Sequence, residues 1–245
     1  EEALSLSKYL HDLGIILHYQ SDQFLRNIVI LFPEWSTNAL YKILDSQETF
    51  LSGRNGILYL SDLPKIWNDA ETYPEDKYLF LLRIMEKFDL CYSIDKKTFL
   101  VAELLENTFI DCPKGWNLLD SECICINYKY DFMPAGIMTR FIVKIHDYIA
   151  TENGKNLCWK KGVYLKHKSA YAFVRMKDSI SEKTIQVKVH KTCNSIDERE
   201  LLFKIRETIR ELNNMFKNIN VEELVPCNCS PDCDFQFPYN VLCNA

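Results

Sequence analysis

The sequence predicts an α+β fold with two subdomains: an N-terminal one containing a winged-helix-like unit, and a C-terminal one with an antiparallel sheet flanked by helices. Two observations support this prediction. Residues 33–103 give the order helix, short strand, helix, helix and hairpin, which is that of a winged helix. Residues 123–218 alternate strand-like segments with polar loops and add two amphipathic helices. Hydrophobic residues form 47% of the chain, which is ample for a packed core.

A smaller unit precedes the winged helix. Residues 3–13 predict an amphipathic helix, which Gly14 ends as a left-handed cap. Residues 15–19 and 27–32 predict two strands joined by a polar loop. His11 and His18 flank this turn, and we interpret both as structural because neither has an acidic or cysteine partner at metal-ligand spacing.

The helices of the winged helix begin where the sequence gives a physical reason. Proline fits the first turn of a helix and an acid suits its positive end, so Pro33 with Glu34 begins the first helix and Pro74 begins the third. Ser61 and Asp62 are candidate caps of the second. The strands are predicted at residues 57–60, 90–94 and 98–101. The first helix is expected to bury Trp35, Leu40, Ile43 and Leu44.

The second half of the chain predicts an antiparallel meander. Its elements are a strand at 123–130, a helix at 137–149, strands at 157–165, 170–176 and 184–190, and a long helix from Ser195. Residues 109–122 contain Pro113 and Gly115 and show no clear period, so we predict a hinge there. The expected domains are residues 1–108, the hinge 109–122, residues 123–225, and a cysteine-containing tail at 226–245.

A winged helix raises the possibility of a DNA-binding regulator, which is the first alternative function, but the charge of the chain disfavours it. Residues 75–88 hold three basic and three acidic side chains, and the whole chain carries 29 basic and 34 acidic residues, a net charge of −5. Because phosphate contacts need a surplus of Lys and Arg, we do not expect nucleic acid as a partner. Charge alone does not exclude DNA binding. We interpret the winged helix as a protein-packing module.

Catalytic motifs are absent from the sequence. It has no GxxxxGK[ST] phosphate-binding loop, and residues 53–56 (GRNG) supply the glycines without the lysine. It also lacks GxSxG, HExxH and a dinucleotide fingerprint. We therefore predict that this fragment is not an enzyme and has no catalytic residues.

The compartment follows from hydropathy and cysteine use. No apolar run approaches the roughly 18 residues that span a bilayer, and no signal peptide opens the sequence. Most of the 10 cysteines lie in apolar segments, which fits a reducing compartment. We expect a cytoplasmic protein without a membrane span. Because the sequence begins at Glu1 and Glu2 without Met, we also expect a piece of a longer polypeptide.

The C-terminal loop carries a group of thiols. Cys227, Cys229 and Cys233 lie close together on a polar segment, and Cys243 follows ten residues later. Thiolate zinc sites often combine a tight turn with a distant fourth ligand, so these four residues are candidate ligands of a structural Zn²⁺. The spacing is not the usual CxxC pair, and free thiols are the alternative. A zinc-loop adaptor that binds a partner protein is therefore a second alternative function.

Five separated blocks of sequence carry a family resemblance. They are residues 10–19 (LHDLGIILHY), 33–35 (PEW), 85–91 (MEKFDLC), 130–138 (YDFMPAGIM) and 159–165 (WKKGVYL). Together they closely resemble the COR domain (C-terminal of Roc) of Roco proteins, over nearly the whole chain. In that family COR directly follows a Ras-like GTPase domain called Roc, often itself preceded by leucine-rich repeats. The missing phosphate-binding loop agrees with a chain that lacks Roc.

The resemblance implies a non-catalytic regulatory and dimerisation domain. The N-terminal half would pack on the Roc GTPase domain and the C-terminal half would form a homodimer, so that nucleotide state and protomer association influence each other. GTP or GDP with Mg²⁺ would be bound by the neighbouring domain, and the parent protein would be a GTPase. The candidate interface residues are Val29, Leu31 and Trp35 toward Roc and Tyr130, Phe132 and Met133 in the dimer, with plain core packing as the alternative.

Overall fold

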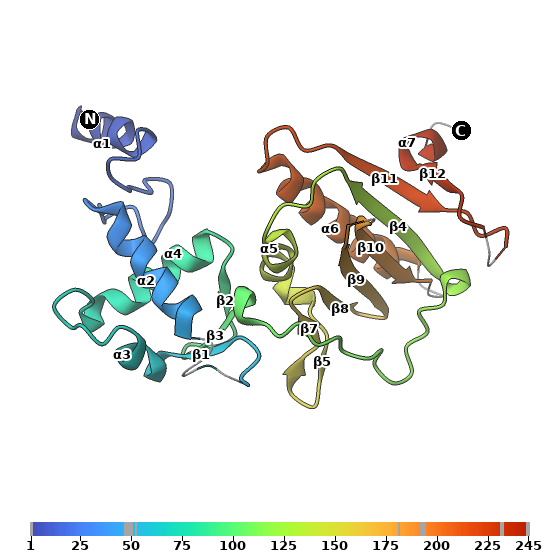
Figure 1. Cartoon of the computed structure of the whole chain (residues 1–245), viewed down its shortest axis with the longest axis horizontal. Helices are drawn as coiled ribbons and strands as arrows, with labels where there is room; N and C mark the ends of the chain where they lie inside the picture. The colour runs from blue at the N-terminus through green and yellow to red at the C-terminus, as the bar shows by residue number, and fades with distance from the viewer. Residues whose placement is uncertain are drawn as a thin grey trace. The chain divides into compact units, whose positions relative to one another are not determined.

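Helices and antiparallel strands occur in both halves of the chain, which confirms the predicted α+β class (Figure 1). The computed structural model describes residues 2–46, 51, 53–180, 182–191, 195–230 and 233–243. It divides into a first unit, Glu1–Leu104, and a second unit, Leu105–Ala245. Within the described ranges, no helix is both long enough and apolar enough to cross a bilayer.

The first unit contains the predicted order of helix, strand, helix, helix and hairpin. Its elements are α1 (Glu2–Asp12), α2 (Pro33–Asp45), β1 (Ile57–Tyr59), α3 (Leu63–Ile66), α4 (Tyr78–Lys87), β2 (Cys91–Ser93) and β3 (Thr98–Val101). The three strands form one antiparallel sheet in the order β1-β3-β2. The name winged helix stays a prediction.

The core of the first unit lies between α2, α3 and α4. Ile43 of α2, Leu63 of α3 and Leu81 of α4 are completely buried there. Trp67 follows α3, and its indole Nε1–H donates to the carbonyl of Ala39 at 2.9 Å, which ties α3 to α2. As predicted, α2 begins at Pro33. Of the side chains expected to be buried on α2, Trp35, Leu40 and Leu44 are only partly covered, although they pack against this core.

The two strands predicted between α1 and α2 are wrong. Residues 15–19 and 27–32 meet only at an isolated antiparallel bridge between Leu17 and Ile30. The loop between them folds on itself instead, because Asp22 Oδ1 accepts the N–H groups of Phe24 and Leu25 at 3.0 and 3.1 Å. Two short segments without a third strand to cover them do not make a stable ladder.

The second unit is built on a seven-stranded antiparallel sheet of order β12-β11-β4-β10-β9-β8-β7. The strands are β4 (Cys123–Tyr130), β7 (Cys158–Trp159), β8 (Gly162–His167), β9 (Ala170–Asp178), β10 (Lys183–His190), β11 (Val221–Pro226) and β12 (Gln236–Pro238). A separate hairpin joins β5 (Thr151–Glu152) to β6 (Lys155–Asn156). Consecutive strands from β7 to β10 pair in order, so the predicted meander is present. The single strand predicted over residues 157–165 is wrong, because the chain turns there and forms the two paired strands β7 and β8.

Two helices cover one face of this sheet. The helices α5 (Ile137–Lys144) and α6 (Ser195–Asn214) contact each other, and both contact β8. The predicted helix over residues 137–149 ends at Lys144 and continues only as a 3₁₀ turn, His146–Tyr148. Near the start of α6, Asp197 accepts hydrogen bonds from the Ser169 amide at 3.2 Å and the Ser169 hydroxyl at 2.6 Å. These bonds fix the helix to the turn before β9.

The segment predicted as a hinge packs against the second unit. The ring of Trp116 lies 4.4 Å from that of Tyr171, and Phe109 meets Trp159 edge-on at 5.2 Å. The hydroxyl of Tyr164 donates to the carbonyl of Ile110 at 3.0 Å. Side chains alternate between the faces of a strand, so these rings lie opposite the face that buries Ala172 and Val174. Residues 109–119 therefore cover part of the sheet.

The end of the predicted range 123–225 and the expected tail at 226–245 add three further elements to the second unit. Strand β11 pairs with β4, strand β12 pairs with β11, and α7 (Tyr239–Cys243) contacts both β11 and β12. The sequence analysis missed all three elements. Strand β11 is only partly buried and the three residues of β12 are all exposed, so neither shows the strong alternation that marks a strand in sequence.

The tight turn between β7 and β8 generates a stability prediction. A Cβ atom on Gly162 would overlap the six-membered ring of Trp159, which is itself buried. Gly162→Ala is therefore expected to lower the free energy of unfolding by about 2–3 kcal/mol, as overpacking does. Urea denaturation followed by circular dichroism measures this change. Lys161→Ala is the control because its side chain is exposed, and equal stability of the two variants would contradict the prediction.

Candidate interaction surfaces and a thiol cluster

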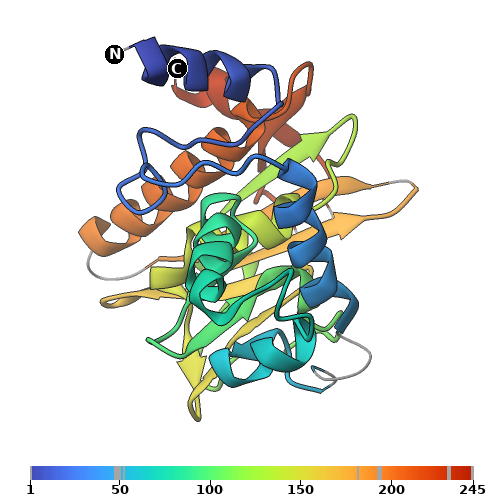
Figure 2. The same cartoon turned by 90° about the vertical axis from the view of Figure 1, so that its left-hand side faces the viewer.

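The first 32 residues expose an unusual number of large apolar side chains. Helix α1, at the N-terminal end in Figure 2, has no buried residue at all. Its amphipathic pattern therefore has no partner within the first unit. We call residues 2–32 the N-terminal apolar segment. Its exposed large apolar residues are Leu4, Leu6, Tyr9, Leu13, Ile15, Phe24, Ile28, Val29, Leu31 and Phe32.

A buried histidine holds this segment together. The Nε2–H of His18 donates to the carbonyl of Arg26 at 2.8 Å, so its Nδ1 accepts from the hydroxyl of Ser7 on α1. The backbone N–H of His18 points to Nδ1 of His11 at 3.4 Å. Gln20 adds a bond from its Nε2 to the carbonyl of Leu4 at 2.8 Å. Both histidines are thus structural, as the sequence analysis proposed, and α1 is fixed although its apolar side chains remain uncovered.

The three residues predicted to face Roc differ in exposure. Val29 and Leu31 are 41% and 64% exposed, whereas Ile30 between them points into the core. Trp35 is committed to the first unit, because its Nε1–H donates to the carbonyl of Thr72 at 2.7 Å and its ring stacks on Tyr73 at 5.9 Å. Val29 and Leu31 are therefore available to a partner, whereas Trp35 is partly buried and packs against the core of the first unit.

The three residues predicted in the dimer interface also differ in exposure. Tyr130 is buried, and its hydroxyl donates to Oδ1 of Asn213 at 3.0 Å. Met133 is buried as well. Phe132 is 67% exposed and borders a hollow of about 280 Å³ with Pro134 and Met215. Of these three side chains, only Phe132 can meet a partner without rearrangement; the assignment to a dimer interface stays a prediction.

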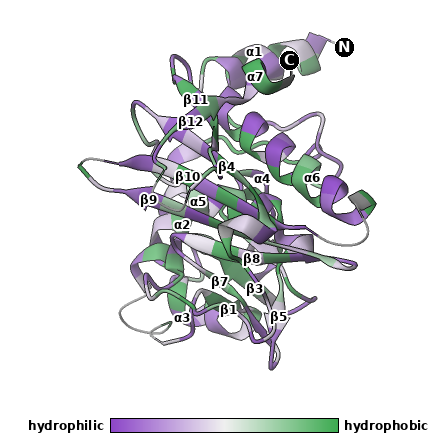
Figure 3. Ribbon diagram, turned by 90° about the vertical axis from the view of Figure 1, so that its right-hand side faces the viewer, coloured by the Kyte–Doolittle hydropathy of each residue, from purple (hydrophilic) through white to green (hydrophobic). Residues whose placement is uncertain are grey.

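Figure 3 shows the ribbons of α6, β11 and β12 coloured by hydropathy. An ion pair between Arg206 and Glu223, which was not predicted from the sequence, joins α6 to β11. Arg206 donates from Nε and Nη2 to the two carboxylate oxygens of Glu223 at 2.7 and 3.2 Å. Its Nη1 donates to the hydroxyl of Tyr239 at 2.7 Å, and the hydroxyl of Tyr128 donates to Glu223 at 3.1 Å. Side chains from β4, α6, β11 and α7 therefore meet at one place.

The electrostatics of this cluster keep Arg206 charged. Burial opposes the charge, but the hydrogen bonds and the carboxylate of Glu223 together raise the pKa of Arg206. Burial first, and then the charge of Glu223, raise the pKa of Tyr128, so its hydroxyl remains a donor. Sequence spacing could not reveal the cluster, because its members come from four elements that only the folded sheet brings together.

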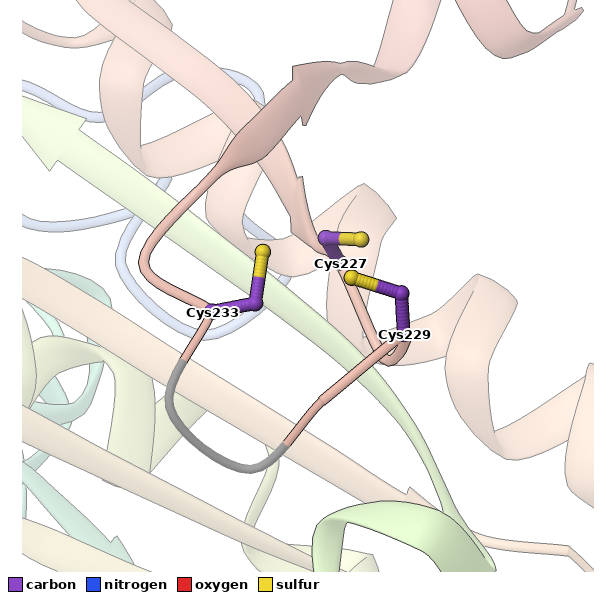
Figure 4. Close-up of side chains that lie close together, drawn as sticks. All are labelled: Cys227, Cys229 and Cys233. Atoms are coloured by element: carbon purple, nitrogen blue, oxygen red, sulfur yellow. The ribbon is translucent and has the colours of Figure 1, made fainter.

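Three of the four candidate zinc ligands lie together in the loop between β11 and β12 (Figure 4). The sulfur atoms of Cys227, Cys229 and Cys233 lie within 4.8 Å of one another. All three are free thiols. Cys243 ends α7, and its side chain lies outside the part of the chain that the structure describes. Its membership of the cluster stays a prediction.

The backbone of the loop supports the cluster. The N–H of Cys227 donates to the carbonyl of Phe235 at 2.8 Å, which continues the hairpin, and the N–H of Cys233 donates to Ser230 at 3.1 Å. A backbone hydrogen bond from Cys229 lowers the pKa of Cys227, whereas hydrogen bonding to Cys227 raises the pKa of Cys229 to about 11. Cys227 is thus the thiol whose anionic form the loop stabilises.

The basic side chains of α4 and its preceding turn do not form a free positive surface. Lys77 pairs with Asp76, Arg83 with Glu86, and Lys87 with Asp22 at 3.4 Å. A DNA-binding helix needs cations directed at phosphates. The structure therefore adds no support to the DNA-binding alternative.

Comparison with known proteins gives matches over almost the whole chain. The family model described as "C-terminal of Roc, COR-A domain" matches residues 1–105. The model described as "C-terminal of Roc, COR-B domain" matches residues 121–244. The boundary between the two matches agrees with the division of the structure into two units.

Three of the curated relatives come from an amoeba and a bacterium. The chain is 28% identical to "Probable serine/threonine-protein kinase pats1" of Dictyostelium discoideum over 100% of its own length and 8% of that protein. It is 28% identical to "Roc-COR-CHAT protease" of Runella zeae, covering 88% of the chain and 22% of the relative. It is 23% identical to "Cyclic GMP-binding protein C" of D. discoideum, covering 90% and 9%. The chain thus spans less than a quarter of each of these proteins.

The ion pair of Arg206 generates a second stability prediction. Arg206→Lys keeps the charge but loses the paired hydrogen bonds to Glu223 and the contact with Tyr239. We expect the free energy of unfolding to fall by about 1–2 kcal/mol, since the two side chains retain 20% and 25% of their exposure.

Urea denaturation monitored by circular dichroism measures this loss. Arg210→Lys is the matched control, because Arg210 lies one turn further along α6 and is exposed. Its expected change is within about 0.5 kcal/mol. A loss of the same size in both variants would contradict the assigned role of Arg206.

Proposed function

The chain belongs to the Roco family as its COR region, a COR-A domain followed by a COR-B domain, and from this premise we propose that it is a regulatory region that packs on the adjacent Roc GTPase domain. In this proposal COR-A forms the contact with Roc and COR-B forms the homodimer. The nucleotide state of Roc then influences the association of the protomers. The chemistry of GTP hydrolysis belongs to Roc, and COR alters its environment.

The comparisons support the proposal that Roc and COR are adjacent domains of one polypeptide. Both family descriptions place COR at the C-terminal side of Roc. The printed name of the Runella zeae relative joins Roc to COR directly. Because COR-A is the first of the two COR domains, its N-terminal residues are the nearest in sequence to a preceding Roc domain.

The N-terminal apolar segment is the observation that carries the proposal. Exposed large apolar side chains gathered in one short segment indicate a surface that another protein covers. Leu31 is 64% exposed, and full burial of such a side chain contributes about 1.5–3 kcal/mol. The bonds of His18 hold the segment in place before any partner binds, so little ordering has to accompany association.

Coupling to the nucleotide imposes a thermodynamic condition. The COR surface must bind the GTP and GDP forms of Roc with different free energies, because a ligand with equal affinity for two states shifts neither. If dimerisation through COR-B changes the relative affinity of Roc for GTP and GDP by some factor, exchange of GDP for GTP must change the dimerisation constant by the same factor. One surface on each COR domain is sufficient for this linkage.

The contact with Roc is tested by Leu31→Glu. We expect the variant to bind the Roc domain of the same polypeptide at least about 10-fold more weakly, because a carboxylate would be buried where a leucine packs. Calorimetric titration with Roc loaded with GDP, and then with a non-hydrolysable GTP analogue, measures both affinities.

Leu79→Glu is the matched control for this experiment. Leu79 is 58% exposed on α4, in the same unit but outside the N-terminal apolar segment. Its affinity for Roc should stay unchanged. If the Leu31 variant and the unaltered chain bind Roc with equal affinity in both nucleotide states, the N-terminal apolar segment is not part of the Roc interface.

The dimer is tested by solution mass, with Phe132→Glu as the variant. We expect sedimentation equilibrium to show a self-association constant that differs between GDP-bound and GTP-bound Roc when the two domains are joined. Phe132→Glu should weaken self-association at least about 10-fold, because the exposed ring is replaced by a charge. Phe203→Glu is the control, since Phe203 on α6 is equally exposed at 67%. A monomer in every state would contradict the dimerisation part of the proposal and leave the Roc contact standing.

A further inference from the structure

The thiol cluster of Cys227, Cys229 and Cys233 has no part in contact with Roc or in dimerisation as proposed above. It lies in the loop that joins β11 to β12 in the COR-B domain. We propose that these three thiolates form a Zn²⁺ site with an open fourth coordination position.

The distances between the sulfur atoms fit this metal. A tetrahedral zinc ion with Zn–S bonds of about 2.3 Å holds its sulfur ligands about 3.8 Å apart. The three sulfurs already lie within 4.8 Å of one another, so each pair has to approach by about 1 Å or less. Figure 4 shows that the three side chains extend into the same space from the two arms of the loop. The chain therefore brings soft ligands together before the metal arrives.

The backbone provides the support that zinc ligands normally have. Hydrogen bonds to a ligand orient it and tune its charge, and their loss weakens metal binding. The amide of Cys229 donates to Cys227, so one of the three sulfurs has such a bond. The bond from the Cys227 amide to Phe235 fixes the first arm against the second at the base of the loop.

The surroundings leave room for a fourth ligand. Cys227 and Cys233 border a surface hollow of about 530 Å³ that Lys188 and Ser121 also line. Three thiolates around Zn²⁺ carry one net negative charge, and the ammonium of Lys188 on the same hollow offsets it. Water from the hollow can complete the tetrahedron, as in zinc sites that retain an exchangeable position.

Zinc at this place would clamp the outer edge of the sheet. The loop connects β11, which pairs with β4, to β12, which pairs with β11 over three residue pairs and accepts a side-chain hydrogen bond from Asn127 of β4 at Gln236. Binding energy supplied by the metal adds directly to folding energy, because the unfolded chain holds no preformed site. The predicted effect is that β12 and α7 become more stable against local opening when zinc is bound.

The test uses the chain purified with reductant and stripped of metal by a chelator. Titration with ZnCl₂ against a chromophoric chelator should give one ion per chain. Replacement by Co²⁺ should give a thiolate-to-cobalt charge-transfer band and intense visible bands of tetrahedral cobalt. Each of Cys227→Ser, Cys229→Ser and Cys233→Ser should weaken Zn²⁺ at least about 100-fold, more than the loss of an outer hydrogen bond to a ligand usually does.

Cys112→Ser is the matched control, because Cys112 is an exposed thiol of the same unit outside the cluster. Alkylation by iodoacetamide with peptide mass spectrometry provides a measurement on the unaltered chain. Zinc should protect Cys227, Cys229 and Cys233 and leave the modification of Cys112 unchanged. Binding that survives all three single substitutions, equal alkylation with and without zinc, or octahedral cobalt would overturn the proposal. A disulfide between two of the three cysteines that persists after treatment with reductant would also overturn it.

Discussion

The pairing of β4 on both of its edges is the interaction on which the second unit depends. One edge of β4 pairs with β10 and the other pairs with β11, which lies much later in the chain. The first pairing attaches the whole meander of β7 to β10, and the second attaches β11, β12 and α7. The ion pair between Arg206 and Glu223 reinforces the second pairing from the helix side. Cys227 is held in place because it directly follows β11 and its amide bonds to the carbonyl of Phe235.

The two units differ in how far their apolar side chains are covered by their own chain. In the COR-B domain, α5 and α6 cover one face of the sheet and the rings of residues 109–119 cover part of the other. In the COR-A domain, the helices around Trp67 form a closed core, yet α1 buries none of its side chains. The N-terminal apolar segment is held in place by the hydrogen bonds of His18 and not by the packing of its apolar side chains. This difference supports an assignment of partner binding to the first domain.

Sequence alone predicted the elements that carry strong local signals. Strand β4 has the bounds that its alternation predicted, α2 begins at Pro33, and α6 begins at Ser195. The predicted strands around Leu17 and Ile30 failed because pairing depends on neighbouring strands, which a local pattern does not contain. Cys227, Cys229 and Cys233 lie together, as their short spacing in the sequence suggested, while the binding of a metal and the part of Cys243 stay predictions. Tyr130 and Met133 resembled interface residues by type, and only the folded core shows that they are buried.

The two ends of the seven-stranded sheet are unusually short. At one end β7 contributes two residues, Cys158 and Trp159, and at the other β12 contributes three. Long, flat edge strands invite hydrogen bonding by a foreign strand and lead to aggregation, and very short ones prevent it. Neither end strand therefore offers a second protomer a long edge to which it could add a strand. Any lasting assembly of this domain has to be selected by the shape and chemistry of its side chains.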